Sequence, residues 1–203
     1  MGVFSGGGFY FGRLITEAEI RVGGRRAGRR PFFHPATLQP KLAGCMVNLA
    51  RARPAQTLLD PFCGAGAILI EAALLGCHPV GMDISSSMIL GSKKNLAHFG
   101  VSVFDLMVGD ARELPFGKVG AVTTDPPYGR IASTRGSDVK QLYREFLNGI
   151  TERLRSGSYI CLAAPQALQV KDLANEAGFK RNESHLIHVH DGLTREVSVF
   201  RRK

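Results

Sequence analysis

The stretch LLDPFCGAG, residues 58–66, has the form of a short buried strand that ends in an acid and continues through a glycine-rich turn into a helix. In an open α/β sheet, such a turn lies at the carboxyl ends of the strands, where ligands bind. Gly64 and Gly66 leave the backbone bare at this point, so a ligand can approach it closely. The stretch therefore predicts a fold class and one edge of a binding site.

Apolar runs and helical patterns alternate along the rest of the chain, which is typical of a parallel sheet with helices on both faces. Strands are expected within residues 57–60, 79–83, 101–110, 119–125, 158–164, 184–190 and 195–200. Helices are expected from Pro35 to before Pro54 and over 67–76, 85–100, 137–154 and 165–177. The last two strands are joined at Asp191-Gly192 and predict an antiparallel hairpin. The fold class is thus α/β, with a mostly parallel seven-stranded sheet.

Positive charge is concentrated at the start of the chain. Of the net charge of +9, residues 1–54 carry +7 and residues 55–203 carry +2. Residues 1–33 are expected to form a strand and a basic linker, and residues 34–203 the domain. A basic arm on a near-neutral body favours a nucleic-acid partner, and a solvated basic face is the alternative. Arg25, Arg26, Arg29 and Arg30 have the same two interpretations, phosphate contacts or a solvated linker.

Several classes of site and location are disfavoured. The four cysteines lack metal-ligand spacing and are expected to be buried thiols, and His185, His188 and His190 have no partner residues for a metal, so no metal is predicted. No apolar segment reaches the roughly 18 residues of a membrane span. A cytoplasmic protein without membrane contact is expected.

The acid after the second expected strand points to an adenosyl ligand. Asp83 lies 17 residues past Gly66 and suits the two hydroxyls of a ribose. A dinucleotide fingerprint needs a small residue where Leu69 stands, and no phosphate-loop lysine is present, so a phosphate-free ligand is favoured. Asp110, before Ala111, either meets the adenine edge or caps a turn.

The second informative stretch is TTDPPYGR, residues 123–130. Each residue before a proline is held extended, and the two prolines lack N–H donors, so Asp125 and the Pro126 carbonyl form an edge of acceptors. Such an edge suits an exocyclic NH2 group, whose lone pair two acceptors can direct at an electrophilic methyl. Tyr128 is placed to stack on the base and Gly129 to let the chain turn away. Asp60 and Asp125 are expected to face one crevice.

DPFCGAG with Asp83, followed by DPPY, resembles the Rossmann-like S-adenosylmethionine-dependent methyltransferases that act on amino groups of bases. The segments RRPFFHPATLQPKLA (29–43), DPPYGR with ASTRG after it, and LTREVSVFRR (193–202) are similar to the tRNA guanosine-10 N2-methyltransferases known from archaea. The resemblance implies an RNA methyltransferase that uses S-adenosylmethionine and modifies guanosine N2 in tRNA.

The resemblance also implies roles for individual residues. Asp125, Pro126 and Tyr128 would hold the guanine as catalytic residues. The implied cofactor contacts are Asp60, Phe62, Gly64, Gly66, Asp83, Asp110, Ala111, His34, Pro35 and Thr37. The implied substrate contacts are Pro127, Gly129, Arg130, Arg29 and Arg30.

The N-terminal region departs from the family pattern. Full-length members carry an RNA-binding THUMP region, which 33 residues cannot hold, so either a catalytic-domain fragment or a minimal relative is expected. Two other functions stay open: N6-adenine methylation of DNA or RNA, and a non-catalytic subunit that binds cofactor and positions RNA. A monomer is favoured as the oligomeric state, and the need for a small activator subunit is open.

Overall fold

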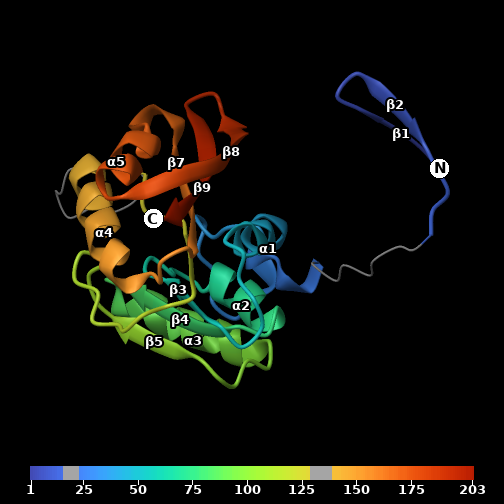
Figure 1. Cartoon of the computed structure of the whole chain (residues 1–203). Coiled ribbons are helices and arrows are strands. Elements are labelled where there is room, and N and C mark those ends of the chain that lie inside the picture. The colour runs from blue at the N-terminus through green and yellow to red at the C-terminus, as the bar shows by residue number, and fades with distance from the viewer. Residues whose placement is uncertain (16–22, 129–138) are drawn as a thin grey trace.

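A seven-stranded sheet forms the centre of the computed structural model, which describes residues 1–15, 23–128 and 139–203 (Figure 1). Its strands are β3 (Thr57–Asp60), β4 (His78–Asp83), β5 (Asp105–Val108), β6 (Ala121–Thr124), β7 (Tyr159–Pro165), β8 (Phe179–His190) and β9 (Leu193–Arg202). They lie in the order β5-β4-β3-β6-β7-β9-β8. β3 to β7 pair in parallel, and β9 pairs antiparallel with both β7 and β8. The predicted sheet and C-terminal hairpin are confirmed.

Alternate residues of the central strands face two layers of helices, as the two-residue period of a strand requires. Leu58, Ala121 and Cys161 pack in one cluster with α1 (Pro40–Leu49) and α2 (Ala67–Leu74). Leu59, Val122 and Leu162 pack in another with α4 (Val139–Arg153) and α5 (Val170–Glu176), on the opposite side of the sheet in Figure 1. The remaining helix, α3 (Ser86–His98), contacts α2, β4 and β5.

Two expected helices have different limits in the structure. The first begins at Pro40, five residues after Pro35, because residues 34–37 form a turn in which the Thr37 amide donates to the His34 carbonyl. The expected helix over 165–177 is broken. Pro165 ends β7, Gln166–Leu168 form a short 3-10 turn, and Gln169 has a left-handed φ of 52°, so α5 starts only at Val170.

Residues 1–15 contain two strands rather than one. β1 (Gly2–Ser5) and β2 (Gly8–Phe11) form an antiparallel hairpin, and Gly6 and Gly7 supply the positive φ angles of its turn. In the described residues no helix is long and apolar enough to cross a membrane.

The basic segment that follows lies against the domain. Gly23–Arg25 and Ala27–Arg29 are short 3-10 turns, and Ala27 is buried. The Phe32 amide donates to Asn95 of α3, whose own amide group donates back to the Phe32 carbonyl. This segment is therefore bound to the domain surface through specific contacts.

Candidate active site

Four acids lie at the carboxyl edge of the sheet, where the parallel strands end. Asp60 is the last residue of β3 and Asp83 the last of β4, while Asp110 and Asp125 closely follow β5 and β6. Asp60 pairs in register with Gly81, and Asp83 with Val108, so the ends of neighbouring strands are staggered by only a few residues. Burial is the main cause of the raised pKa of Asp60, and the charges of Asp125 and Asp83 raise it further. These three acids therefore lie close together.

The two glycines of the turn after β3 are needed for different reasons. Gly64 has a φ of 49°, and a Cβ built on it would meet nothing within 4 Å, so the backbone is open to a ligand there. Gly66 has a φ of 80°, and its Cβ would lie 2.4 Å from Ser92 Oγ on α3. Its missing side chain therefore allows α2 and α3 to pack closely. Asn95 steadies the turn by donating to the Ala65 carbonyl at 2.9 Å.

Asp83 is oriented by backbone amides. Gly64 N and Ser85 N each donate to one of its carboxylate oxygens at 2.9 Å. The pKa of Asp83 is raised because the carboxylate is buried, and the two amides and the nearby His34 offset only part of that rise. A carboxylate has about four lone-pair sites, so both oxygens can still accept a hydrogen bond from a ligand hydroxyl.

Asp60 is buried, with 1% of its surface exposed. Thr124 Oγ1 donates to its Oδ1 at 2.8 Å and the Phe62 amide donates to the same oxygen at 3.2 Å. Burial nevertheless raises the pKa of Asp60 to about 8, because the lost hydration outweighs these two hydrogen bonds. Near neutral pH this carboxyl group is therefore mostly protonated.

Asp125 and Tyr128 form a hydrogen-bonded group with Arg195 of β9. The Tyr128 hydroxyl donates to Asp125 Oδ1 and accepts from Arg195 Nε at 2.7 Å. Arg195 Nη2 lies 3.8 Å from Asp125 Oδ2. Burial raises the pKa of Asp125, and Arg195 and the tyrosine hydrogen bond oppose that rise. Pro126 is buried and Pro127 half-buried, whereas Gly129 and Arg130 lie outside the described residues.

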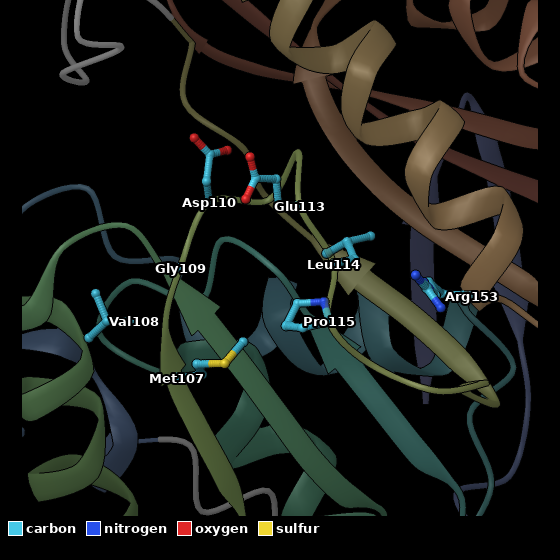
Figure 2. A pocket seen from close by; sticks show the side chains of 8 residues that line it. All are labelled: Met107, Val108, Gly109, Asp110, Glu113, Leu114, Pro115 and Arg153. Carbon is cyan, nitrogen blue, oxygen red and sulfur yellow. The ribbon is translucent and has the colours of Figure 1, made fainter.

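Asp110 is held by an arginine. Arg112 donates to its carboxylate through Nε at 3.0 Å and Nη2 at 2.6 Å, and Ala111 beside it is buried. Figure 2 shows Asp110 above a pocket of ≈ 440 Å³ at the end of β5, lined also by Met107, Leu114 and Arg153. The other three acids, Asp60, Asp83 and Asp125, do not line this pocket, so it lies at the β5 side of the four acids rather than between them.

The residues expected from the N-terminal segment are divided between site and scaffold. His34 lies near Asp83 and lowers its pKa, and Pro35 is exposed. Thr37 Oγ1 is buried and has no hydrogen-bond partner among the described residues. Arg29 is exposed, but Arg30 is only 6% exposed. The expectation that Arg30 contacts phosphates is therefore corrected: its side chain lies inside, where Nε donates to the Arg25 carbonyl. Arg25 itself pairs with Glu71 of α2 at 2.8 Å.

Sequence reasoning missed two residues of this site, Thr124 and Arg195. Both stand in stretches that it singled out, TTDPPYGR and LTREVSVFRR. The direction of the last strand could have identified Arg195. A final antiparallel strand begins at the edge where its parallel neighbour ends, and Arg195 pairs with Pro165 at the end of β7.

The cysteines and histidines were predicted not to form a site. Cys63, Cys77 and Cys161 are buried as expected, but the prediction for Cys45 was wrong, because it is exposed on α1. Across residues 1–15, 23–128 and 139–203, no group of three His, Cys, Asp or Glu side chains is arranged to hold a metal ion.

Comparison with known proteins places this geometry in a family. Residues 27–196 match the model of the RMKL-like methyltransferase domain. The tRNA (guanine(10)-N2)-dimethyltransferase of Methanothermobacter thermautotrophicus is 46% identical over 191 residues, which cover 94% of this chain and 56% of that protein. A probable tRNA (guanine(10)-N2)-dimethyltransferase of Methanothermococcus thermolithotrophicus is 31% identical, over 80% of this chain and 98% of the relative.

A solved structure agrees with these sequence matches. TrmN from Thermus thermophilus superposes with a TM-score of 0.71 and 27% identity, covering 83% of this chain and 50% of that one. The chain spans 56%, 53% and 48% of the first three curated relatives, or about half their length. With most of its residues matched by the family model, the chain belongs to the family of RMKL-like methyltransferase domains.

Proposed function

We propose that this chain transfers a methyl group from S-adenosylmethionine to the exocyclic N2 of a guanosine in tRNA, at position 10. The observation that carries the proposal is the position of Asp125-Pro126-Pro127-Tyr128, at the end of β6 and beside the glycine turn that follows β3. The names of the archaeal relatives support guanine N2 as the target and tRNA as the substrate. An enzyme of this kind would act in the cytoplasm, as a monomer.

The residues around the glycine turn fit S-adenosylmethionine. Gly64 is open to a ligand, and both carboxylate oxygens of Asp83 can still accept from ribose hydroxyls. Thr37 Oγ1 is a buried polar atom that no other described residue bonds. Asp60, Phe62, Gly64 and Gly66 would surround the methionine end together with His34, Pro35 and Thr37. Ala111 and the backbone of Asp110 would contact adenine. When bound, S-adenosylmethionine supplies an electrophilic methyl group.

The chain's own residues would prepare the amine for methylation. Asp125 and the Pro126 carbonyl accept the two hydrogens of N2, which directs the nitrogen lone pair away from the ring plane. Tyr128 would stack on the base, contributing about 1–3 kcal/mol. For this, the Tyr128 hydroxyl would give up its hydrogen bond to Asp125, and the carboxylate would then accept a hydrogen bond from the guanine amino group. Asp125 would also take the proton that the methylated nitrogen releases and pass it to water.

The remaining contacts would bind the RNA. Pro127, Gly129 and Arg130 follow the catalytic acid directly in sequence, and Arg29 is exposed on the basic segment. The tRNA is the proposed partner, and a small activator subunit is compatible with this assignment.

Nucleoside analysis tests the function. The chain would be incubated with S-adenosylmethionine that carries a labelled methyl group and an unmodified tRNA transcript, and the product digested and analysed by mass spectrometry. We expect N2-methylguanosine or N2,N2-dimethylguanosine, and none from a transcript with adenosine at position 10. N6-methyladenosine would establish the adenine alternative instead. Binding of both ligands without transfer, even with cell extract added, would establish a non-catalytic subunit.

Cofactor binding should depend on pH through Asp60. The proposed cofactor is cationic at sulfur and at its amino group, so it favours the ionised form of a carboxyl group whose pKa is about 8 in the free protein. Binding should therefore release a proton below pH 8, and affinity should rise with pH up to about tenfold per unit, then level off. Calorimetry between pH 6 and 9, in buffers of different ionisation enthalpy, measures both effects.

An Asp60→Asn variant provides the matched control for this titration. Its affinity should change much less over the same pH range, because the substituted amide does not ionise. An affinity that is flat with pH in the unmodified chain, or that falls, would contradict the assignment of Asp60 to the cationic end of the cofactor.

A further inference from the structure

Arg195 is placed at the proposed base site by the reversal of the last strand. It lies near the start of β9 and pairs with Pro165 at the end of β7. β7 in turn pairs with β6, which leads into Asp125. Arg195 thus reaches the same edge of the sheet as the four acids, although 70 residues of sequence separate it from Asp125.

The Arg195 side chain is mostly buried against the catalytic motif. Its side chain is 16% exposed and that of Asp125 14%. Nε donates to the Tyr128 hydroxyl at 2.7 Å, and the guanidinium carbon lies 5.4 Å from the centre of the tyrosine ring. Within the part of the chain that the structure describes, Arg195 contacts the motif through Nε and Nη2, and Nη1 makes no hydrogen bond, which leaves it able to donate to a ligand.

We propose that Arg195 selects guanine as the target base by donating a hydrogen bond to its O6. The inference rests on the proposed function, because it concerns the base whose N2 is methylated. The Watson–Crick edge of guanine presents two donors, N2–H and N1–H, and then the O6 acceptor. The Asp125 carboxylate and the Arg195 guanidinium lie side by side as an acceptor and a donor, which matches that order.

Adenine does not match the same pair of charges. With its amino group against Asp125, adenine would direct the N1 lone pair at the carboxylate and a C–H group at Arg195. Both charged groups would lose a partner in a largely dehydrated site, which costs far more than an exposed mismatch. Arg195 therefore distinguishes guanine from adenine, whereas Asp125 and Pro126 recognise any amino group on a planar ring.

A base analogue combined with an Arg195 variant tests the contact with O6. 2-Aminopurine keeps the amino group of guanine and lacks O6 and N1–H. RNA carrying guanosine or 2-aminopurine at the target position would be compared by kcat/KM, with the wild-type chain and with Arg195→Met, which keeps the side-chain length without donors. We expect wild type to favour guanosine by about 100-fold, and the variant to reduce that preference by about tenfold.

The possible results distinguish a wrong role for Arg195 from a wrong assignment of the methylation activity. If wild type methylates neither RNA, the proposed function fails. If wild type methylates guanosine but Arg195→Met slows both substrates by the same factor, Arg195 only positions Tyr128 and Asp125, and its role in selecting guanine is overturned. Arg195→Lys, which restores one donor, should recover part of the preference for guanosine.

A second measurement needs no variant and covers the case in which Arg195→Met fails to fold. 6-Thioguanosine keeps N1–H and the amino group but replaces O6 with sulfur, a weak acceptor. We expect kcat/KM of the wild-type chain to fall about tenfold on this RNA. An unchanged kcat/KM would overturn the proposed hydrogen bond to O6.

Discussion

Replacing Asp125 with alanine should lower methyl transfer by about 10²–10⁴-fold and leave cofactor affinity nearly unchanged. The carboxylate is the acceptor that would hold the amino group. It also accepts a hydrogen bond from Tyr128 and lies beside the guanidinium of Arg195. Without it, the amine keeps its lone pair in the ring, where it is a poor nucleophile. Single-turnover methylation and calorimetric titration with the cofactor measure the two effects separately.

Asp191→Ala is the matched control for this variant. Asp191 is exposed in the turn between β8 and β9, and the same change of residue there removes a carboxylate from the surface. Its rate should equal that of the unmodified chain. Retained turnover in Asp125→Ala would refute the catalytic role, and a loss of cofactor affinity would show that Asp125 belongs to the cofactor site instead.

Replacing Gly66 with alanine should destabilise the fold by about 3 kcal/mol and lower Tm by about 6–12 °C. A residue with a side chain pays about 1–2 kcal/mol for the left-handed conformation that Gly66 adopts at φ 80°. Its Cβ would also lie 2.4 Å from Ser92 Oγ, and overpacking of this kind costs about 1–3 kcal/mol. Differential scanning calorimetry measures the change.

Two further variants separate the contributions of conformation and contact. Gly100 has a similar φ of 71°, but its Cβ would meet nothing within 4 Å, so Gly100→Ala should cost only about 1–2 kcal/mol. Adding Ser92→Ala to Gly66→Ala removes the clashing hydroxyl and should restore part of the lost stability. Equal destabilisation by both glycine substitutions, without rescue by Ser92→Ala, would exclude the helix contact as a cause.

Local sequence predicted the parts of this fold that depend on near neighbours. The hydrophobic period identifies β3, β4, β6 and β7, and the acids at the ends of β3, β4 and β6 follow from their positions before a turn. The same logic brings Asp60 and Asp125 to one edge of the sheet. Thr124, which bonds to Asp60, confirms that these two strand ends are adjacent.

The missed features depend on contacts between distant segments. Arg30 stands in a basic run that is typical of an exposed linker, yet packing of residues 25–32 on the domain buries it. Gln169 adopts a left-handed conformation that no local signal required, and the helix breaks there. Arg195 has neighbours in sequence that belong to an ordinary strand, and only the order of strands in the sheet reveals its partners.

The position of β9 between β7 and β8 has a consequence for how the protein is made. As the chain leaves the ribosome, residues up to Asp125 supply the glycine turn and all four acids. The last parallel strand, β7, then remains an open edge until β9 has been synthesised and has inserted beside it. The glycine turn and the acids would therefore leave the ribosome before Arg195, which reaches the proposed base site only when β9 joins the sheet.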